Sequence, residues 1–268
     1  MNIRKDIDGD LGFSTEMSLT LDELTFVREC VSISLCREIR TESEEIASQA
    51  MSLGITHYHC LTLPFHHGDF WVKTRRLLPF AAVGHIRSMS FFKKLEQEFG
   101  PLRISNEEEL MPEEVTWRLV RPGCAEDVGT VHADSWFWAL GHGRMPAGYR
   151  RFKIWIPLHT EPGRNGILCA PGTHRLPHPP YRVERRGGIM KPVLDVDPQS
   201  LGLRLLPLEP GSVFAFHDDL LHGGAVNTGM TCRISIEFTC LYEDSCGPVD
   251  EDRNTPNMGG SMMNGDRP

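Results

Sequence analysis

Two histidines and one aspartate are the residues whose types and spacing best suit chemistry. His132 and Asp134 lie two positions apart in the segment 131–138, and in an extended chain the side chains at i and i+2 point to the same side. One imidazole and one carboxylate are two of the three ligands in the facial triad that binds ferrous iron in non-haem oxygenases. Since a His-x-Asp pair is common by chance, the prediction needs a third ligand. We assign His222 to that role, with His217 as the rival ligand.

An arginine that follows His222 supports this prediction. His222 and Arg233 flank a turn at 227–229. Directly opposed residues of an antiparallel hairpin have a constant index sum, so a hairpin closed at this turn makes the two residues cross-strand neighbours, about 5 Å apart at Cβ. A guanidinium beside a metal-ligating imidazole suits an anion that chelates the metal, because arginine grips a carboxylate through two parallel hydrogen bonds. The structural alternative is that His132 and Asp134 form a buried hydrogen-bonded pair.

The first hundred residues predict a helical layer. Thr20 and Glu23 have the spacing of a capping box at a helix start, and an apolar stripe at helical spacing follows. Its members are Leu24, Val27, Val31 and Leu35. Further helices are predicted over 42–53 and 91–99, each ending before a glycine. Residues 1–19 are polar and are predicted to be loose.

From about residue 115 the pattern changes to short strands separated by Pro and Gly turn signals. The predicted strands are 115–120, 152–158, 166–170, 204–208, 212–216 and 232–242. Many short strands of this kind are typical of an antiparallel jelly roll, and helices followed by strands indicate the α+β class. We predict one catalytic domain over residues 1–246, with the helical layer at about 20–100 and the strand core at about 115–243. Residues 247–268 are predicted to be a disordered tail.

Composition excludes several classes of function. The chain has 268 residues and a net charge of −8, which argues against a general nucleic-acid binder. No stretch is long and apolar enough for a membrane span, and the first ten residues lack the apolar core of a signal peptide. We therefore expect a cytoplasmic protein whose eight cysteines are reduced. The oligomeric state is not readable from the sequence.

Together the motifs resemble the phytanoyl-CoA dioxygenase family of Fe(II)/2-oxoglutarate-dependent oxygenases. The order His132-x-Asp134, then His222, then Arg233 is similar to the family's pattern, and the resemblance spans about residues 115–240. It implies a double-stranded β-helix, the cupin-like form of the jelly roll, behind the N-terminal helical layer.

Two turns extend the resemblance and one position departs from it. Residues 154–158 and 166–175 resemble the family's strand, turn and Pro-Gly-Ser-His signature. Residues 209–213 resemble the turn before the strand that carries the distal histidine. The departure is Gly224, where the family often has a serine that contacts the cosubstrate.

The resemblance implies the roles of the site residues. His132, Asp134 and His222 bind Fe(II), and Arg233 binds the distal carboxylate of 2-oxoglutarate. Three protein ligands leave three octahedral positions, two for the 2-oxo acid and one for O₂. The expected reaction oxidises a small-molecule metabolite, most simply by hydroxylation, with release of succinate and CO₂. Asp134 also argues against halogenation, since related halogenases lack this carboxylate.

Other outcomes stay open. The same chemistry can end in desaturation, epimerisation or C–C cleavage, and a non-catalytic jelly-roll protein that binds a metal or a ligand is the alternative from another class.

A second arginine, Arg118, has two possible roles. Arg233 and Glu237 share one face of a predicted strand, so Glu237 points into the barrel if Arg233 does. A buried carboxylate needs a partner. Arg118 is either that partner or a second contributor to cosubstrate binding, and the sequence leaves both roles open.

Aromatic and basic residues near the metal motif are the substrate candidates. Trp136 and Trp138 directly follow the motif and form either a substrate-facing wall or hydrophobic core. The segment 141–148 is rich in Gly and Pro, and is either a lid or a plain surface connection. With Arg144 and Trp155 these residues suit an amphipathic or anionic metabolite, and natural-product tailoring is the role we favour.

Overall fold

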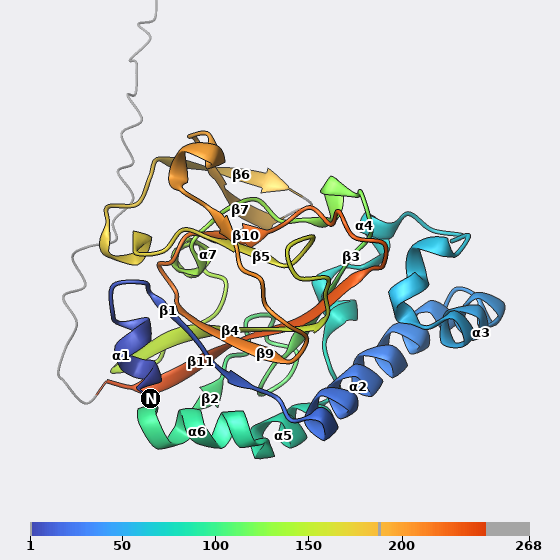
Figure 1. Ribbon diagram of the computed structural model, residues 1–268, viewed down its shortest axis with the longest axis horizontal. Helices are drawn as coiled ribbons and strands as arrows, with labels where there is room; N and C mark the ends of the chain where they lie inside the picture. The colour runs from blue at the N-terminus through green and yellow to red at the C-terminus, as the bar shows by residue number, and fades with distance from the viewer. Residues whose placement is uncertain (1, 187–188, 245–268) are drawn as a thin grey trace, which may run out of the picture.

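The computed structural model describes residues 2–186 and 189–244. Most of the chain's helices cover one side of a large antiparallel sheet, and a smaller sheet faces it from the other side (Figure 1). The tail predicted over 247–268 lies outside the described residues. None of the described helices is both long and apolar enough to span a membrane.

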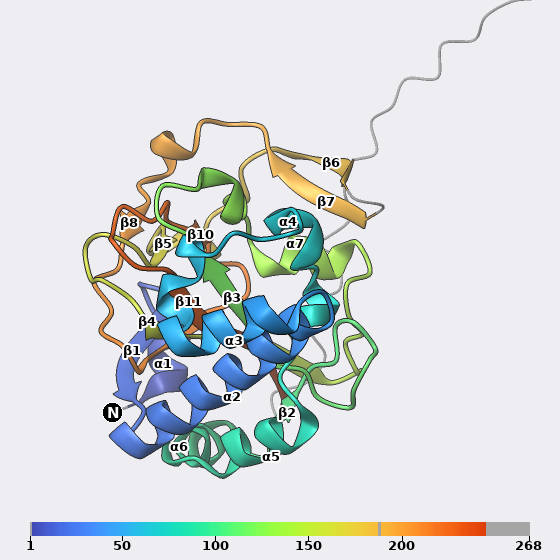
Figure 2. The same cartoon turned by 90° about the vertical axis from the view of Figure 1, so that its right-hand side faces the viewer.

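The helical layer forms where the apolar stripe predicts it. Helix α2 (Leu21–Arg40) begins at Thr20, which forms the expected capping box with Glu23. Its stripe is buried in the main core together with residues of the large sheet. Figure 2 shows α2 and its neighbours packed side by side in front of the strands. The other helices are α1 (Ile3–Ile7), α3 (Glu44–Leu53), α4 (His67–Phe70), α5 (Phe80–Ser88), α6 (Ser90–Phe99) and α7 (Asp134–Ala139).

All described strand pairs are antiparallel. The large sheet runs β1 (Phe13–Ser18), β9 (Ser212–His217), β4 (Tyr149–His159), β11 (Arg233–Glu243) and β2 (Arg103–Ile104), and β3 (Thr116–Val120) also pairs with β11. The small sheet runs β10 (His222–Gly224), β5 (Ile167–Cys169) and β8 (Arg204–Leu205). A separate hairpin joins β6 (Tyr181–Arg186) and β7 (Ile189–Leu194). Two antiparallel sheets with helices outside form an α+β jelly roll, as predicted.

Strand β4 shows how the sheet separates two environments. Alternate residues of a strand face opposite sides. Phe152, Ile154 and Ile156 pack into the core beneath the helices. The residues between them, Lys153 and Trp155, face the interior of the barrel, where they are registered with Thr239 and Glu237 of β11. The interior is thus lined by polar as well as aromatic side chains.

The first residues are ordered, which corrects the prediction of a loose start. Ile3 and Ile7 of α1 are buried, as are Met17 and Leu19, and β1 pairs with β9 at the edge of the large sheet. Four apolar side chains spread among polar residues are too sparse for a periodicity signal, but they are enough to bury both elements against the finished sheet.

The predicted hairpin between His222 and Arg233 is also wrong. His222 lies in β10, which pairs with β5, whereas Arg233 begins β11, which pairs with β3 and β4. The connection between them crosses from one sheet to the other. Asn227 anchors it: the buried amide nitrogen donates to the carbonyl oxygens of Val120 at 3.0 Å and Thr231 at 2.8 Å. The segment between His222 and Arg233 therefore links two sheets and is not the turn of a two-stranded hairpin.

A buried histidine in the helical layer makes acid sensitivity testable. His67 is 7% exposed, and its Nδ1 lies 3.2 Å from the hydroxyl of Tyr58. Burial lowers the pKa of His67 to about 4, although Asp127 opposes the shift. Below pH 6.5 the unfolded chain therefore takes up a proton that the native state resists. We expect metal-free protein to lose up to about 3 kcal/mol of unfolding free energy from this group as the pH falls from 7 to 4.

Urea unfolding at several pH values measures this effect. In His67→Phe the fall of unfolding free energy between pH 7 and pH 4 should be smaller than in the parent, because the group that titrates is gone. Equal slopes for parent and variant would contradict the assignment.

Candidate metal centre

The three predicted ligands meet at one point in the barrel. The backbones of His132 and His222 form an isolated antiparallel bridge, with both N–H···O distances 2.9 Å. Asp134 is the first residue of α7, so the pair His132-x-Asp134 stands at a change from extended chain to helix. Ala133 between them is still extended, with φ −105° and ψ 142°. Both side chains therefore point to the same side, although the segment is not a strand throughout.

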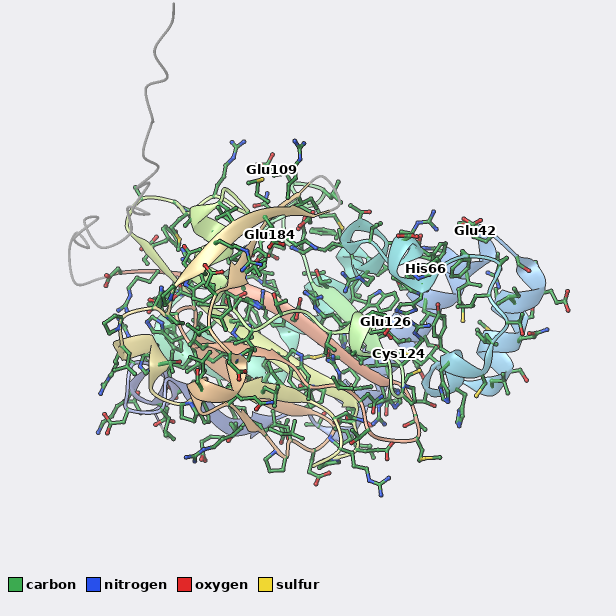
Figure 3. The ribbon with its side chains drawn as sticks, turned by 90° about the horizontal axis from the view of Figure 1, so that it is seen from above. Glu42, His66, Glu109, Cys124, Glu126 and Glu184 are labelled. Carbon is green, nitrogen blue, oxygen red and sulfur yellow. The ribbon has the colours of Figure 1, made fainter. Side chains whose placement is uncertain are left out.

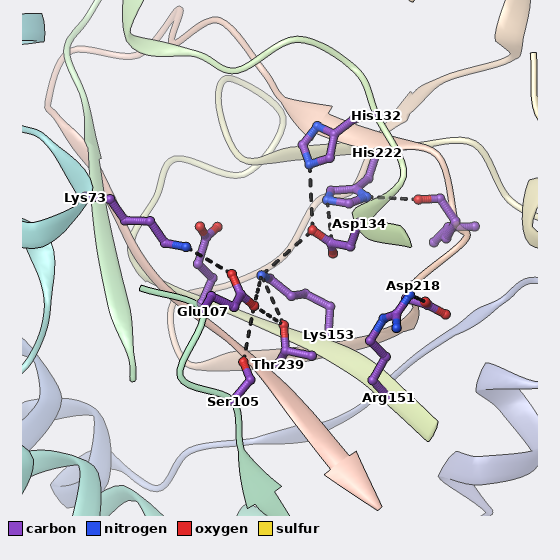
Figure 4. A network of polar contacts seen from close by, with 12 residues as sticks. Lys73, Ser105, Glu107, His132, Asp134, Arg151, Lys153, Asp218, His222 and Thr239 are labelled. Atoms are coloured by element: carbon purple, nitrogen blue, oxygen red, sulfur yellow. Dashed lines mark hydrogen bonds and ion pairs between the residues drawn. The ribbon is translucent and has the colours of Figure 1, made fainter. Parts of the chain in front are cut away.

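The distances are those of three groups around a common centre. His132 Nε2 lies 3.8 Å from Asp134 Oδ1, and His222 Nε2 lies 3.7 Å from Asp134 Oδ2 (Figure 4). One ligand atom from each residue lies within 4.8 Å of the others. Asp134 and His222 are buried and His132 is partly exposed. The cluster is therefore closest to solvent on the side of His132.

Hydrogen bonds orient both imidazoles toward the carboxylate. His132 Nδ1 lies 2.7 Å from the carbonyl oxygen of Thr130, and His222 Nδ1 lies 2.9 Å from that of Leu220. A carbonyl only accepts, so each Nδ1 carries the proton and each Nε2 presents a lone pair. Asp134 Oδ2 is buried and has no hydrogen-bond donor among the described residues. The lone pairs of the two Nε2 atoms and of Asp134 Oδ2 thus face one another with no proton between them, an arrangement that suits a bound cation. Metal-ligating histidines in proteins are held in the same way, with the other ring N–H donated to a carbonyl or carboxylate oxygen.

The charge states support the same conclusion. Burial lowers the pKa of His222 to about 4, which leaves its imidazole neutral at pH 7. Burial by itself would raise the pKa of Asp134, but Lys153 and His222 outweigh it and hold that pKa far below its usual value. Near neutral pH His222 is thus a neutral imidazole and Asp134 a carboxylate, the protonation states that metal binding requires.

The rival ligand, His217, belongs to a different cluster. It is the last residue of β9 and lies beside Asp218 and Asp219, which follow the strand. The backbone N–H of Asp219 donates to His217 Nδ1 at 3.1 Å, and Arg151 forms an ion pair with Asp218 at 2.6 Å. These groups satisfy one another without a metal.

Arg233 is a buried cation that forms no ion pair with a carboxylate of the described residues. It is 3% exposed, its Nη1 donates to Ser235 Oγ at 2.8 Å, and its buried Nε has no acceptor among the described residues. The guanidinium lies over the ring of Trp155, with its carbon 5.7 Å from the ring centre. Burial lowers the pKa of Arg233 to about 10, so it is still charged at neutral pH. A buried unpaired charge is costly, and a bound anion would relieve that cost.

The guanidinium also approaches the strand of His222, although the two residues are not a hairpin pair. A Cβ built at Gly224 would lie 3.7 Å from Arg233 Nη2 and 2.4 Å from Val128 Cγ1. The serine found here in many family members would therefore collide with Val128. The close approach of Val128 therefore explains why position 224 is a glycine in this chain.

Arg118 has Glu237 as its partner. Its Nε donates to Glu237 Oε1 at 2.7 Å. Burial would raise the pKa of Glu237, but Arg118 and Lys153 lower it to about 2. The structure thus supplies the ion pair that was one of the two predicted roles. A part of Arg118 in cosubstrate binding stays a prediction.

The sequence analysis missed two charged residues beside the triad. Lys153 Nζ lies 3.8 Å from Asp134 Oδ1 and 3.8 Å from Glu107 Oε1, and Lys73 Nζ lies 3.0 Å from Glu107 Oε2 (Figure 4). The sequence could have indicated Lys153 as a residue of the barrel interior, because the strict alternation in 152–158 places it on the same strand face as Trp155. No local pattern indicates Glu107, which reaches the barrel from an irregular segment.

The predicted substrate residues lie in four different environments. Trp136 is 2% exposed, stacks on Tyr181 with ring centres 4.2 Å apart, and belongs to an apolar cluster. Trp155 is buried under Arg233. The guanidinium of Arg151 lies over the half-buried ring of Trp138 at 4.7 Å.

Arg144 is the most exposed of the four. Its side chain is 86% exposed and forms an ion pair with Glu109, which is labelled at the surface in Figure 3. Of the two roles predicted for Trp136, a substrate-facing wall or hydrophobic core, the structure thus shows the core position. Trp138 and Arg144 are accessible.

An antiparallel jelly roll that gathers two histidines and one carboxylate at its interior is the arrangement of non-haem iron oxygenases. The sequence model of the phytanoyl-CoA dioxygenase family, PhyH, matches residues 72–235. This match covers more than half of the chain and includes the three candidate ligands and Arg233. The chain belongs to the phytanoyl-CoA dioxygenase family, whose members are Fe(II)- and 2-oxoglutarate-dependent oxygenases.

Two solved structures of EctD share the fold, and a structure of ThoJ is also similar to the chain. EctD from S. alaskensis, crystallised with 2-oxoglutarate and 5-hydroxyectoine, is 15% identical, with 90% of this chain and 76% of that chain covered and a TM-score of 0.52. EctD with bound Fe is also 15% identical, with coverages of 88% and 75% and a TM-score of 0.51. The apo non-heme monooxygenase ThoJ is 14% identical, with coverages of 88% and 77% and a TM-score of 0.48. None of the curated proteins matches the chain significantly.

Proposed function

We propose that this protein is an Fe(II)/2-oxoglutarate-dependent dioxygenase that oxidises, most simply hydroxylates, a small-molecule metabolite with release of succinate and CO₂. The observation that carries the proposal is the convergence of His132, Asp134 and His222 with their ligand atoms within 4.8 Å. Membership of the phytanoyl-CoA dioxygenase family supports it.

The residues present fit the metal. His132 Nε2, His222 Nε2 and Asp134 Oδ2 are the donors, and they are aimed by the Thr130 and Leu220 carbonyls and left without a proton between them. When bound, ferrous iron supplies the oxidative decarboxylation of 2-oxoglutarate that is coupled to substrate oxidation. The protein's own part is to orient the three ligands and, by burial, to keep the imidazole of His222 neutral.

Arg233 is the proposed anchor of the cosubstrate. Its buried guanidinium offers a planar fork to the distal carboxylate, and Ser235 and Trp155 fix its position. The charges of iron, Asp134, 2-oxoglutarate and Arg233 cancel, and such compensation makes a buried group of charges tolerable.

The substrate side of the proposal rests on the accessible residues. Trp138 precedes the segment 141–148 and Arg144 lies within it. The segment is tied to the β6–β7 hairpin by His142, whose Nε2 lies 2.9 Å from the carbonyl oxygen of Met190. An aromatic ring and a guanidinium suit an amphipathic or anionic metabolite. Natural-product tailoring remains our proposal for the biological role.

Substrate-free turnover tests the proposed function. We expect chelator-treated protein to form succinate from 2-oxoglutarate only after Fe(II), ascorbate and O₂ are added. Protein that binds neither Fe(II) nor 2-oxoglutarate would contradict the proposal. Tight binding of both without any succinate would favour the non-catalytic alternative.

A further inference from the structure

Lys153 is a buried ammonium group beside one of the proposed metal ligands. Its side chain is 10% exposed, and Nζ lies 3.8 Å from Asp134 Oδ1, 3.8 Å from Glu107 Oε1 and 3.4 Å from Thr239 Oγ1 (Figure 4). These contacts are long for a charge that has left water, because a buried charge is normally paired and hydrogen-bonded closely. Lys153 therefore stands between two carboxylates and attracts both through its charge, without a close hydrogen bond to either.

Glu107 is stabilised by Lys153 and by a second cation, Lys73. Lys73 Nζ lies 3.0 Å from Glu107 Oε2, and Thr239 Oγ1 donates to Glu107 Oε1 at 2.7 Å. Ser105 Oγ also donates to Glu107 Oε1 at 3.2 Å. Without Lys153, Glu107 would keep a lysine and two hydroxyl donors, whereas Asp134 would lose the lysine that most lowers its pKa.

The two oxygens of Asp134 face different groups. Oδ1 lies 3.8 Å from Lys153 Nζ and 3.8 Å from His132 Nε2. Oδ2 lies 3.7 Å from His222 Nε2 and, although buried, has no hydrogen-bond donor among the described residues. One oxygen thus has a fixed cation beside it, and the other is available to a metal ion.

We propose that Lys153 is a positioning residue that holds Oδ1 of Asp134 and so keeps this carboxylate a one-oxygen ligand. The inference rests on the proposed function. An octahedral ion with three protein donors has three positions left, and a 2-oxo acid with dioxygen needs all of them. A carboxylate that bound through both oxygens would occupy one. The same ammonium repels a metal ion, so Lys153 weakens metal binding while it preserves reactivity.

The variant Lys153→Met tests the proposal, because the two effects have opposite signs. Methionine is unbranched, apolar and adaptable in a buried position. We expect calorimetric titration of chelator-treated protein to show about tenfold tighter binding of Co(II). The visible absorption of Co(II) with 2-oxoglutarate should change, because the coordination changes. Succinate formation with Fe(II) should fall about 10–100-fold, as it does when groups around metal ligands are removed.

A purely structural lysine would give a different result, since its loss would weaken Co(II) binding, thermal stability and turnover together. Co(II) binding that is unchanged or weaker in Lys153→Met, or succinate formation equal to that of the parent, overturns the proposal. If that variant does not fold, Lys153→Gln replaces it. It has no charge but keeps a donor, so Co(II) binding should still tighten while less turnover is lost. Unchanged Co(II) binding in Lys153→Gln overturns the proposal equally.

Lys73→Met is the matched control. Lys73 lies at the other end of the same row of charges and forms ion pairs with Glu107 and Glu108. Its replacement should leave Co(II) affinity unchanged, and a rise equal to that of Lys153→Met would show a general charge effect and overturn the proposal. A parent protein that neither binds Co(II) nor forms succinate contradicts the proposed function itself. If the parent protein binds Co(II) and forms succinate, and Lys153→Met gives the same values as the parent, only the proposed role of Lys153 is contradicted.

Discussion

Replacement of His222 by alanine should abolish Fe(II)-dependent succinate formation and weaken metal binding by more than about 100-fold, since removal of groups that only support metal ligands already costs 10–100-fold. Both ring nitrogens of His222 have a partner at the site: Nδ1 lies 2.9 Å from the Leu220 carbonyl oxygen, and Nε2 lies 3.7 Å from Asp134 Oδ2. No other described imidazole shares the cluster with His132 and Asp134. Calorimetric metal titration and succinate quantification by mass spectrometry measure the two effects.

His217→Ala is the control for this prediction. His217 precedes His222 by five residues and also neighbours carboxylates, but its Nδ1 accepts the backbone N–H of Asp219. We expect metal affinity close to that of the parent. If His217→Ala loses the metal and His222→Ala keeps it, the distal ligand is misassigned. Circular dichroism of both variants checks that the fold persists.

Replacement of Arg233 by alanine should raise the Kd for 2-oxoglutarate at least about 30-fold, which corresponds to ~2 kcal/mol or more. The guanidinium is 3% exposed and has only Ser235 as a hydrogen-bond partner among the described residues. An anion that binds there gains a charge-assisted pair in a site that is already dehydrated. Metal affinity should change little, since Arg233 is not among the three clustered ligands.

Two variants sharpen the test of the cosubstrate site. Arg233→Lys keeps the charge but loses the planar fork, so its Kd for 2-oxoglutarate should lie between those of the parent and of Arg233→Ala. Arg118→Gln breaks the pair with Glu237 and should affect the Kd less than Arg233→Ala does. A larger effect of Arg118→Gln would make Arg118 the main anchor. Unchanged 2-oxoglutarate binding in Arg233→Ala would remove Arg233 from the site.

Local patterns predicted the elements well where the signal lies within a few residues. The capping box at Thr20 and the stripe of α2 depend only on helical periodicity, and both are present. The alternation in 152–158 lies within β4. The strand expected over 204–208 covers only Arg204–Leu205, because β8 is an edge strand that pairs with β5 alone.

Long-range pairing was not predictable in the same way. The sum rule that paired His222 with Arg233 assumes that neighbouring strands belong to one sheet, whereas the connection at Asn227 crosses between two. Which strands pair depends on how the whole barrel closes, and no window of sequence contains that information. The same reason hides Glu107, which meets Lys153 from a segment 46 positions away.

Residue types alone were sufficient to name a chemistry: two imidazoles and a carboxylate suit a ferrous ion, and a guanidinium suits a carboxylate. Folding decided how those groups are presented. It made Nδ1 of both histidines donors to carbonyls, left one oxygen of Asp134 without a donor, and put an ammonium group beside the other. Hydrogen bonds and charges act over a few ångströms in space, so they follow the packing of the barrel and not the order of the chain.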